Sequence, residues 1–300
     1  MDFVVNAKRY NMKIVNVIGG LGNQMFQYAF ALALKTRFKN EDILIDIHHF
    51  NHYKLHNGFE LTNIFKGVDI SIATKIQLKK VTYYVPHYLL SRFVRTFLPK
   101  CRTEFIEEIE YVYDSKPLNL EGNYYFEGYW QVYKYYSNIK QQILEAFEFP
   151  HPNGYNNKLA LEIKKYNSVG IHIRRGDYLN HKDFKGLCEL DYYQRAISDL
   201  MSISNDYKFY VFSNDIKWCI ENIQPLIGEQ QVIYITENKG NDSFWDMYLM
   251  SKCRNLIIAN SSFSWWGAFL NTKAERIYVP TRWVNRNYEV EIYDPTWIKI

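Results

Sequence analysis

The stretch that decides the fold is SVGIHIRRGDY, residues 168–178. Its first six residues form an apolar run of the length expected for a buried β-strand. Arg174 and Arg175 follow at the carboxyl end of that predicted strand. Ligands of doubly wound sheets bind outside the carboxyl ends of the strands, and the planar guanidinium of arginine donates two parallel hydrogen bonds to phosphate. We therefore predict a phosphate site here, the alternative being a surface arginine pair bridged to Asp177.

The rest of the second half alternates between strand and helix patterns. Short β-branched or aromatic runs, which predict strands, lie at 169–173, 208–212, 231–235, 256–259 and 276–279. Apolar residues at three- and four-residue spacings, which predict helices, lie at 190–201, 216–223, 243–254 and 264–271. The first half opens in the same way, with a strand at 13–18, a helix at 23–38 and a strand at 43–47. This alternation predicts βαβ units and mainly parallel sheets.

The pattern divides into two Rossmann-like α/β domains. Two prolines and a glycine interrupt it between residues 149 and 154, a composition typical of a connection. We therefore predict one domain over residues 1–150 and a second over 151–300. Residues 1–11 precede the first predicted strand and are followed by a second methionine, Met12, so they are either a dispensable extension or an alternative start.

Composition narrows the class of protein. A chain of 300 residues with 47% hydrophobic residues can bury the cores of two domains. Its net charge of +4, from 36 basic and 32 acidic residues, is too small to indicate a nucleic-acid partner. The four cysteines are scattered, which predicts neither a zinc site nor a disulfide framework. Without the pattern of a secretory signal near the first residues, we expect a cytoplasmic protein.

The region between about residues 66 and 140 has no clear periodicity and many tyrosines. Within it, residues 75–100 are both basic and aromatic. Such a stretch suits peripheral contact with an anionic membrane, here the cytoplasmic face of the inner membrane. We favour a solvated face of the first domain instead, because Pro86 interrupts the stretch and its apolar residues can equally pack on that domain.

A glycine turn, GGLGNQ at residues 19–24, lies between the first predicted strand and helix. Glycines there let backbone N–H groups approach a ligand, and the following helix N-terminus favours negative charge. The turn imitates a dinucleotide fingerprint, and Asp46 occupies the place of its ribose-binding acid. Met25 stands where the third glycine is expected, which weakens a nicotinamide interpretation. A purely structural turn remains the other possibility.

Polar segments follow three further predicted strands, at residues 212–215, 236–237 and 260–264. Helix capping explains one or two such residues, and hydroxyl and N–H groups there suit a diphosphate opposite Arg174. The sequence has no Asp-x-Asp and no metal-ligand pair of histidines and cysteines, so we expect protein groups rather than a metal to neutralise the diphosphate. Histidines 48, 49, 52 and 56 cluster on a polar loop, where a metal site is the less favoured interpretation.

These residues resemble the bacterial α-1,2-fucosyltransferases from about Met12 to the C-terminus. The motifs that carry the resemblance are GGLGNQMFQYA at 19–29, FEL at 59–61, GYWQ at 128–131, HIRRGD at 172–177, FSND at 212–215 and NSSFSWWG at 260–267. The arginine motif is shared with α-1,6- and protein O-fucosyltransferases and so indicates GDP-fucose. The first and last motifs indicate the α-1,2 group.

The resemblance implies a GT-B-like fold with two Rossmann-like domains facing a cleft. It implies a metal-independent enzyme without a cofactor that transfers L-fucose from GDP-β-L-fucose to the 2-hydroxyl of a terminal galactose, with inversion. It places this reaction in the synthesis of cell-surface glycans such as O-antigen or capsule. The second domain is expected to hold GDP-fucose, and the acceptor to enter from the first. The acceptor glycan and the oligomeric state stay open.

The resemblance also implies roles for single residues. Arg174 is expected to stabilise the departing β-phosphate, Arg175 to brace its loop through Asp177, and Asn23 to face the reacting centre. The residues expected to bind GDP-fucose are Gly22, His172, Arg174, Arg175, Asp177, Asn214, Asp215, Ser261, Ser262 and Phe263. Trp130 is the aromatic residue expected to contact the acceptor, whereas Trp265 and Trp266 are expected in the core.

The sequence identifies no general base. The α-1,6 enzymes resembled here have a glutamate five residues after the aspartate of the arginine motif, but this chain has Lys182 there. Asp183, Glu189 and Asp191 are the candidates, and proton transfer to an oxygen of the leaving phosphate is an equal alternative.

Two other classes of function remain as alternatives. An NAD-dependent oxidoreductase would use the glycine turn, but Met25 argues against it. A non-catalytic glycan-binding protein would keep the aromatic residues without needing the arginine pair.

Overall fold

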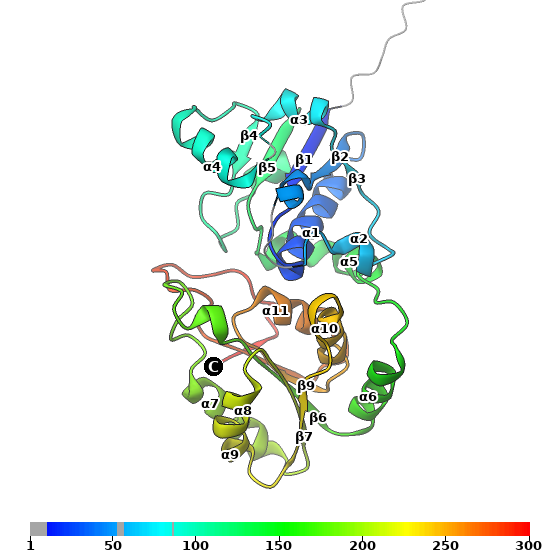
Figure 1. Cartoon of the computed structure of the whole chain (residues 1–300), viewed down its shortest axis with the longest axis vertical. Helices are drawn as coiled ribbons and strands as arrows, with labels where there is room; N and C mark the ends of the chain where they lie inside the picture. Colours follow the sequence, from blue (N-terminus) through cyan, green and yellow to red (C-terminus); the bar gives the residue numbers. More distant parts are fainter. Residues whose placement is uncertain (1–10, 53–56, 86) are drawn as a thin grey trace, which may run out of the picture. The chain divides into compact units, whose positions relative to one another are not determined.

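The computed structural model describes residues 11–52, 57–85 and 87–300, which form two compact units. Unit 1 comprises Met1–Asn63 and Gly67–Ala146, and unit 2 comprises Ile64–Lys66 and Phe147–Ile300 (Figure 1). The division falls four residues before the predicted boundary at 150/151. The short segment Ile64–Lys66 belongs to unit 2 because the ring of Phe65 packs against those of Phe147 and Phe149.

Unit 1 contains a five-stranded sheet in the order β3-β2-β1-β5-β4, and every strand pair in it is parallel. The strands are β1 (Met12–Asn16), β2 (Asp42–Asp46), β3 (Ser71–Ile72), β4 (Glu104–Ile106) and β5 (Tyr124–Glu127). The helices are α1 (Leu21–Arg37), α2 (Leu61–Ile64), α3 (Lys75–Val81), α4 (Tyr88–Phe97) and α5 (Lys140–Ala146). Short 3-10 turns lie at His48–His52, Lys116–Asn119, Tyr133–Tyr135 and Ser137–Ile139. Most of α1 is buried, as its apolar sequence requires.

Unit 2 contains a six-stranded parallel sheet in the order β11-β10-β9-β6-β7-β8. The strands are β6 (Ser168–Ile173), β7 (Lys208–Ser213), β8 (Gln231–Ile235), β9 (Asn255–Ile257), β10 (Arg276–Val279) and β11 (Ile298–Lys299). The helices are α6 (Gly154–Lys165), α7 (Leu190–Ile203), α8 (Ile216–Asn222), α9 (Gln224–Ile227), α10 (Phe244–Met250) and α11 (Ser262–Phe269). The strand order reverses between β6 and β9, so the ligand crevice of this doubly wound sheet is expected at their carboxyl ends.

The central strand β6 shows why this sequence forms a buried strand. All six of its residues are buried, as a parallel strand covered on both faces requires. Gly170 is needed at its centre because a Cβ there would lie 2.8 Å from the Leu256 side chain and 2.9 Å from Sγ of Cys253. The strand therefore ends with His172 and Ile173 fixed in the sheet, directly before the two arginines.

The predicted alternation of strands and helices and the parallel sheets are confirmed. The strands at 231–235 and 276–279 have the predicted bounds. The helix predicted at 243–254 is too long, since α10 ends at Met250. The first ten residues, whose status was open, lie outside the described part of the chain. No helix among the described residues has both the length and the apolar character needed to cross a membrane.

Candidate active site

Arg174 lies just beyond the carboxyl end of β6, at the switch point of the unit 2 sheet. Its Nη2 atom is 2.9 Å from Oδ1 of Asp177, and its Cζ atom is 5.5 Å from the centroid of the Tyr178 ring. Its Nε atom is buried and makes no hydrogen bond to any described residue. The side chain is 34% exposed. Arg174 therefore keeps guanidinium donors available for an anionic ligand.

His172 lies in β6, two residues before Arg174, and is buried. Its burial, with a smaller contribution from the charge of Arg174, lowers its pKa to about 3. The imidazole is therefore neutral at neutral pH. Its Nδ1 atom has no hydrogen-bond partner within the described part of the chain, and the ring of Phe263 lies 6.2 Å away. A neutral imidazole beside Arg174 can donate or accept one hydrogen bond without adding charge.

Arg175 does not pair with Asp177 as predicted. Its Nε atom is 3.3 Å from Oδ2 of Asp215, and its guanidinium lies 4.0 Å from the centroid of the Trp218 ring. Asp177 pairs with Arg174 instead. The backbone of Arg175, at φ −118° and ψ −108°, has left the strand conformation, so spacing along the strand no longer predicts the partners. Arg175 braces its loop against the beginning of α8.

Asn214 and Asp215 follow β7 and hold the arginine loop in place. The backbone N–H of Arg175 donates to Oδ1 of Asn214 at 3.0 Å, and Asp215 caps α8 by accepting from the backbone N–H of Trp218 at 3.1 Å. Gly176 has φ +39°, and a Cβ there would lie 2.5 Å from Nδ2 of Asn214. The loop is therefore built around a glycine. Contact of Asn214 and Asp215 with a nucleotide stays a prediction.

The loop between β9 and α11 lies at the other side of the switch point, because β9 pairs with β6. Ser261 is the N-cap of α11, and Ser262 and Phe263 form its first turn. The first N–H groups of a helix lack partners within it, and the helix dipole there favours an anion. Trp265 and Trp266 are fully buried, which confirms them as core residues. This loop and Arg174 thus offer neutral and charged donors beside one switch point.

The three candidate bases lie on the segment that follows the arginine loop. Asp183 pairs with Arg286, with 3.1 Å between the charged atoms. Asp191, in α7, pairs with Arg195 at 3.3 Å. Glu189 is exposed and immediately precedes α7. Their role in proton transfer stays a prediction.

The glycine turn of unit 1 leads directly into α1. Gly19 has φ +90°, which favours glycine, and Gly22 lies in the first turn of the helix. The buried side chain of Gln24 donates to the carbonyl of Gly19 at 2.9 Å and to that of Gly58 at 2.7 Å. It also accepts from the backbone N–H of Glu60 at 2.9 Å. Gln24 thereby joins the glycine turn to the FEL segment.

Gln27 forms a second junction one turn further along α1. Its Oε1 atom accepts from the backbone N–H of Ile18 at 2.9 Å, and its Nε2 atom donates to the carbonyl of Gly128 at 3.0 Å. Gln27 is fully buried, so both of its polar ends are paired. The GYWQ segment is therefore fixed to the same helix as the FEL segment.

Asn23 forms the third junction, and its orientation follows from a chain of contacts. Nε2 of Gln131 donates to Oδ1 of Asn23 at 2.9 Å. The Asn23 oxygen is therefore occupied, and its amide presents N–H donors in the other direction. Glu107 holds the turn that carries Gln131, because one of its oxygens accepts from the backbone N–H groups of Tyr129 at 2.7 Å and Trp130 at 3.1 Å. Sequence reasoning missed Glu107 because it lies in the region without periodicity.

Trp130 is not available as a sugar-stacking surface. It is only 1% exposed, and its ring stacks on that of Phe30 with 4.0 Å between centroids and an interplanar angle of 6°. Its backbone has φ +57°, and the turn held by Glu107 directs the indole into the core of unit 1. The prediction that Trp130 contacts the acceptor is therefore wrong.

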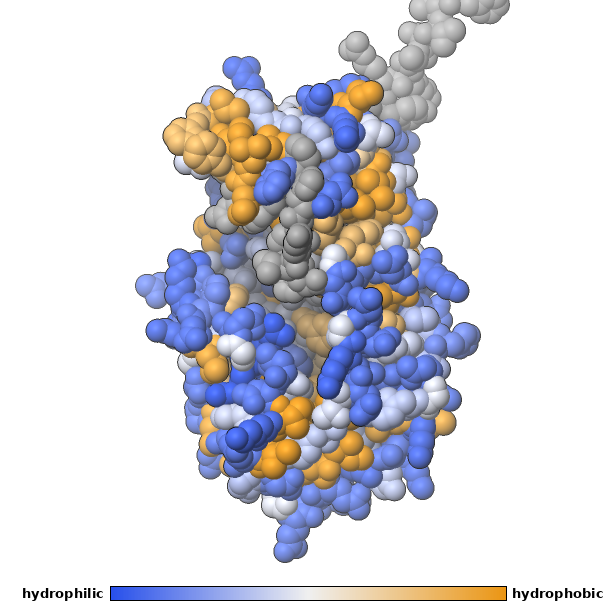
Figure 2. Space-filling model, in the orientation of Figure 1, coloured by the Kyte–Doolittle hydropathy of each residue, from blue (hydrophilic) through white to orange (hydrophobic). Residues whose placement is uncertain are grey.

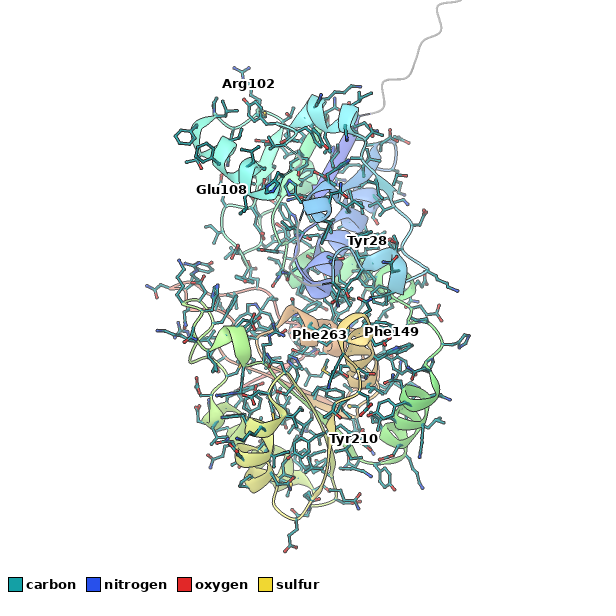
Figure 3. All side chains as sticks on the ribbon, in the orientation of Figure 1. Tyr28, Arg102, Glu108, Phe149, Tyr210 and Phe263 are labelled. Atoms are coloured by element: carbon teal, nitrogen blue, oxygen red, sulfur yellow. The ribbon has the colours of Figure 1, made fainter. Side chains whose placement is uncertain are left out.

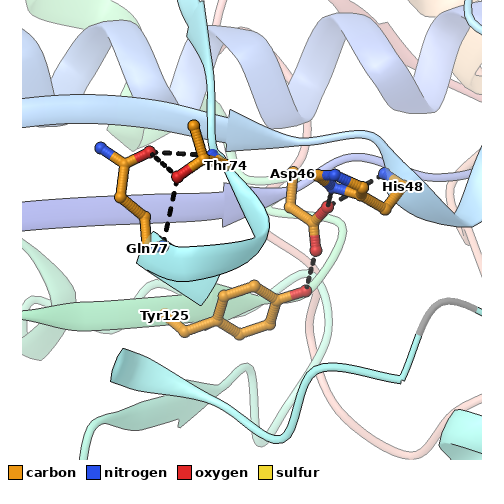
Figure 4. A network of polar contacts seen from close by, with 5 residues as sticks. All are labelled: Asp46, His48, Thr74, Gln77 and Tyr125. Carbon is orange, nitrogen blue, oxygen red and sulfur yellow. Dashed lines mark hydrogen bonds and ion pairs between the residues drawn. The ribbon is translucent and has the colours of Figure 1, made fainter. Parts of the chain in front are cut away.

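Asp46 also has a different role from the ribose-binding acid that the glycine turn suggested. It is buried, and Figure 4 shows its carboxylate between two side chains. Nδ1 of His48 is 2.8 Å from Oδ1 of Asp46, and the hydroxyl of Tyr125 donates to Oδ2 at 3.0 Å. The same view shows the capping box of α3, formed by Thr74 and Gln77. Asp46 is therefore occupied by protein groups that fix the end of β2.

Comparison with known proteins identifies the family. Residues 4–300 match the family model described as glycosyl transferase family 11. This chain belongs to that family. Membership decides against the NAD-dependent oxidoreductase and the non-catalytic glycan-binding protein as alternatives.

Relatives and a solved structure extend the comparison. This family 11 glycosyltransferase is 35% identical over 298 residues to an Escherichia coli alpha-1,2-colitosyltransferase, covering 96% of this chain and 98% of the relative. It is 24% identical over 279 residues to mouse galactoside alpha-(1,2)-fucosyltransferase 2, covering 90% of this chain and 71% of the relative. The fucosyltransferase NodZ from Bradyrhizobium has a similar fold, with a TM-score of 0.55 and 12% identity over 90% of this chain and 95% of that chain. The predicted GT-B-like α/β fold class is confirmed.

The structure of the glycosyltransferase brings the predicted residues together in two groups. In unit 2, His172, Arg174, Arg175, Asn214 and Asp215 adjoin one another around the end of β6. In unit 1, Asn23 adjoins Gln131, a residue of the GYWQ motif for which we predicted no role. Among the described residues, no group of three or more histidines, cysteines and acidic residues is placed to hold a metal. His56, one of the four clustered histidines, lies outside the described residues.

Proposed function

We propose that this glycosyltransferase transfers L-fucose from GDP-β-L-fucose to the 2-hydroxyl of a terminal galactose, forming an α-1,2 linkage with inversion. Family membership establishes glycosyl transfer. The α-1,2 linkage and the sugars are supported by the motifs of the sequence and by the names of the relatives. The observation that carries the proposal is the position of Arg174, which lies at the switch point of the unit 2 sheet and whose Nε atom has no partner among the described residues.

The proposed reaction has a simple charge balance. The acceptor oxygen attacks C1 of fucose while the bond from C1 to the β-phosphate oxygen breaks, so the departing GDP gains negative charge. Donors that strengthen their contact as this charge develops lower the barrier. Arg174 supplies a positive charge for that purpose, and the first turn of α11 supplies neutral N–H donors. The neutral His172 and the Asn23 amide are further proposed substrate contacts.

The acceptor hydroxyl must also lose its proton. We propose either one of Asp183, Glu189 and Asp191 or an oxygen of the departing phosphate as the group that takes it. If one of the carboxylates is the base, its amide variant should lose transfer while keeping the affinity for GDP-fucose. If all three amide variants keep kcat near that of the wild type, an oxygen of the departing phosphate takes the proton. We further propose that this enzyme requires no metal or cofactor, because Arg174 and the N–H donors at the start of α11 can bind the diphosphate in place of a metal.

A second donor has specific support. Colitose is 3-deoxy-L-fucose, and the 35% identical relative is named a colitosyltransferase. Both sugars present the same C1 to the acceptor and differ in one hydroxyl. A site with a polar group that pairs with the 3-hydroxyl would reject the deoxy sugar strongly, whereas a site without one would accept both. Comparing kcat/KM for the two GDP-sugars decides which donor this enzyme prefers.

The first experiment is transfer from GDP-fucose to lactose in excess EDTA, with the product linkage determined by NMR. A fucosyl-α-1,2-galactose product would support the donor, the linkage and the independence from metal together. Slow hydrolysis of GDP-fucose without transfer would keep the donor and reject lactose as acceptor. If GDP-fucose is neither bound nor consumed while GDP-colitose is, the second donor replaces the first.

The cellular setting is also a proposal. We propose that the enzyme acts in the cytoplasm on cell-surface glycans of the O-antigen or capsule type. All four cysteines are free thiols, which suits a reducing compartment. Fractionation of cells that express the enzyme tests this location, and recovery from the periplasm would contradict it.

A further inference from the structure

Helix α4 in unit 1 turns its apolar side chains toward solvent. Leu89, Leu90, Phe93 and Phe97 are between 51% and 72% exposed, whereas Ser91 is buried. A helix on the surface of a soluble domain normally does the opposite and buries its apolar stripe. The exposed residues form what we call the α4 patch, defined as Leu89, Leu90, Phe93, Phe97 and Leu98. Figure 2 shows the hydrophobic surface that gathers over this helix.

The α4 patch is one continuous stripe. Phe93 and Phe97 lie one turn apart, and their ring centroids are 4.9 Å from each other. Leu89 precedes Phe93 by a further turn on the same face. A single exposed leucine needs no explanation, but a stripe of large apolar side chains along a whole helix marks an interaction surface.

The charges on the segment that carries the α4 patch have one sign. Residues 75–102 contain seven lysines and arginines and no aspartate or glutamate. Lys79, Lys80, Lys100 and Arg102 are exposed, and Figure 3 shows Arg102 projecting away from the body of the unit. Without this segment the chain has 29 basic and 32 acidic residues, so the whole positive excess of the protein lies in it. The surface that the α4 patch contacts must therefore tolerate or carry negative charge.

We propose that the α4 patch and its surrounding cations dock this glycosyltransferase on an anionic lipid bilayer. Leucine and phenylalanine side chains enter the boundary between headgroups and acyl chains, while lysine and arginine contact the anionic headgroups. A helix that lies on the bilayer surface in this way needs no membrane-spanning length. The structure favours this interpretation over the solvated face that the sequence suggested, because the residues of the α4 patch are exposed.

A second copy of the chain is the weaker candidate for the occupant. Two α4 patches placed face to face would bring two segments with seven positive charges each against one another. That repulsion opposes association unless anions intervene. An anionic bilayer satisfies both the apolar and the cationic part of the surface. The inference does not depend on which sugar the enzyme transfers.

The first test removes the apolar contact. The full-length enzyme is mixed with vesicles of phosphatidylcholine alone or with phosphatidylglycerol added, and the bound fraction is measured by flotation. We expect the wild type to bind the anionic vesicles, and Phe93→Ser/Phe97→Ser to bind at least about tenfold more weakly, since two aromatic side chains no longer leave water. Leu161→Ser is the matched control, because Leu161 is an equally exposed apolar residue on α6 in unit 2.

The second test reverses two charges without touching the apolar residues. Each basic side chain near an anionic surface strengthens binding about fivefold, so Lys79→Glu/Lys80→Glu should weaken it by about 25-fold or more. Lys158→Glu/Lys273→Glu changes two exposed lysines of unit 2 and should leave binding unchanged. Added salt should weaken wild-type binding in the same direction.

The outcomes are distinct. If the wild type does not bind anionic vesicles, or if both patch variants bind them as the wild type does, the proposal fails. If the wild type is a dimer in analytical ultracentrifugation and Phe93→Ser/Phe97→Ser makes it a monomer without any vesicle binding, the occupant is a second copy. Transfer to a soluble galactoside should be unchanged in every variant, which shows that the altered enzymes are folded.

Discussion

The carboxyl edges of the two sheets are built from different chemistry. In unit 2 the edge carries two guanidiniums, and Arg174 has a buried Nε atom without a partner among the described residues. In unit 1 side-chain amides make most of the junctions at the corresponding edge. Asn23 and Gln27 bond to the GYWQ segment, and Gln24 bonds to Gly58 beside the FEL segment. Both edges belong to parallel sheets with a loop and helix after the first strand. The same architecture thus presents guanidiniums in one unit and, in the other, polar groups that are mostly paired within the protein.

This difference indicates a division of labour. A guanidinium with free donors can respond to charge that develops during a reaction. Amides whose oxygens and hydrogens are already paired inside the protein cannot, but they fix the direction of the few donors that remain free, such as the Asn23 amide. We therefore expect substitutions in unit 2 to act on the rate directly, and those in unit 1 to act through orientation and stability.

The largest effect is expected at the cationic edge. Arg174→Ala removes the donor proposed for the departing phosphate and should lower kcat by about 10²–10³-fold. Arg254→Ala serves as the matched control, since Arg254 is an exposed arginine of the same unit that pairs with Glu275. Steady-state kinetics with saturating GDP-fucose measures the change, and the melting temperature checks the fold. A kcat for Arg174→Ala within a few-fold of the wild type would show that Arg174 does not stabilise the departing phosphate.

A second comparison concerns one buried carboxyl group in each unit. Burial raises the pKa of Glu107 to about 7 from 4.5, and that of Asp246 to about 7 from 3.8. Between the unfolded and folded pKa values each of these groups binds more protons in the folded protein, so its contribution to stability is greatest at low pH and falls as pH rises toward 7. Over that pH range the ionisation of each group should lower the free energy of unfolding by about 3–4 kcal/mol.

Amide variants separate the two contributions. Glu107→Gln should remove the pH-dependent loss from unit 1, and Asp246→Asn that from unit 2, as measured by urea unfolding between pH 4 and about pH 7.5. Each variant is the control for the other. Glu107→Gln keeps an oxygen that can accept from the backbone N–H groups of Tyr129 and Trp130, so the turn should survive. An unchanged pH dependence in both variants would show that neither carboxyl group is protonated near neutrality.

The sequence could predict the alternation of elements and the general location of the site, because both depend on local patterns. Arg174 could be placed from the end of one apolar run. The partners of neighbouring residues could not, since the choice of Asp177 or Asp215 depends on how the backbone turns after the strand. The junctions made by Gln24 and Gln27 join residues up to 101 positions apart, and nothing in local spacing records such pairs.

Burial was harder to predict than position. Trp130 lies in a motif and carries a large aromatic ring, which suits a sugar contact as well as a core. The backbone at Trp130 has a positive φ, which directs the indole into the core, and the sequence does not reveal that conformation. The sequence of α4 likewise does not tell whether its apolar residues face the sheet or the solvent.

In unit 1, the contact from Gln131 is expected to fix the orientation of the Asn23 amide. If Gln131 acts by directing the Asn23 amide, Gln131→Ala should lower kcat by about tenfold while the KM for GDP-fucose changes little. The decisive readout is a double-mutant cycle with Asn23→Ala. Once Asn23 is removed, loss of Gln131 should cost nothing further. Additive losses would show that Gln131 contributes independently, and a loss of stability without any change in kcat would make it only a structural residue.

The smallest effect is expected for two tyrosine hydroxyls, one in each unit, that have a structural role and do not bind substrate. Tyr125→Phe removes a donor to the buried Asp46, and Tyr192→Phe removes one shared by the carbonyls of Ile258 and Tyr278 in unit 2. Each change should lower the free energy of unfolding by about 1 kcal/mol and leave kcat and the KM for GDP-fucose unchanged. Urea unfolding and steady-state kinetics of the two variants measure these quantities. Tyr125→Phe should cost somewhat more than Tyr192→Phe, because it leaves a carboxylate rather than two carbonyls with one donor fewer. If Tyr125→Phe instead raised the KM for the donor, the pairing of Asp46 would matter for substrate binding, and the purely structural role given to Asp46 would be wrong.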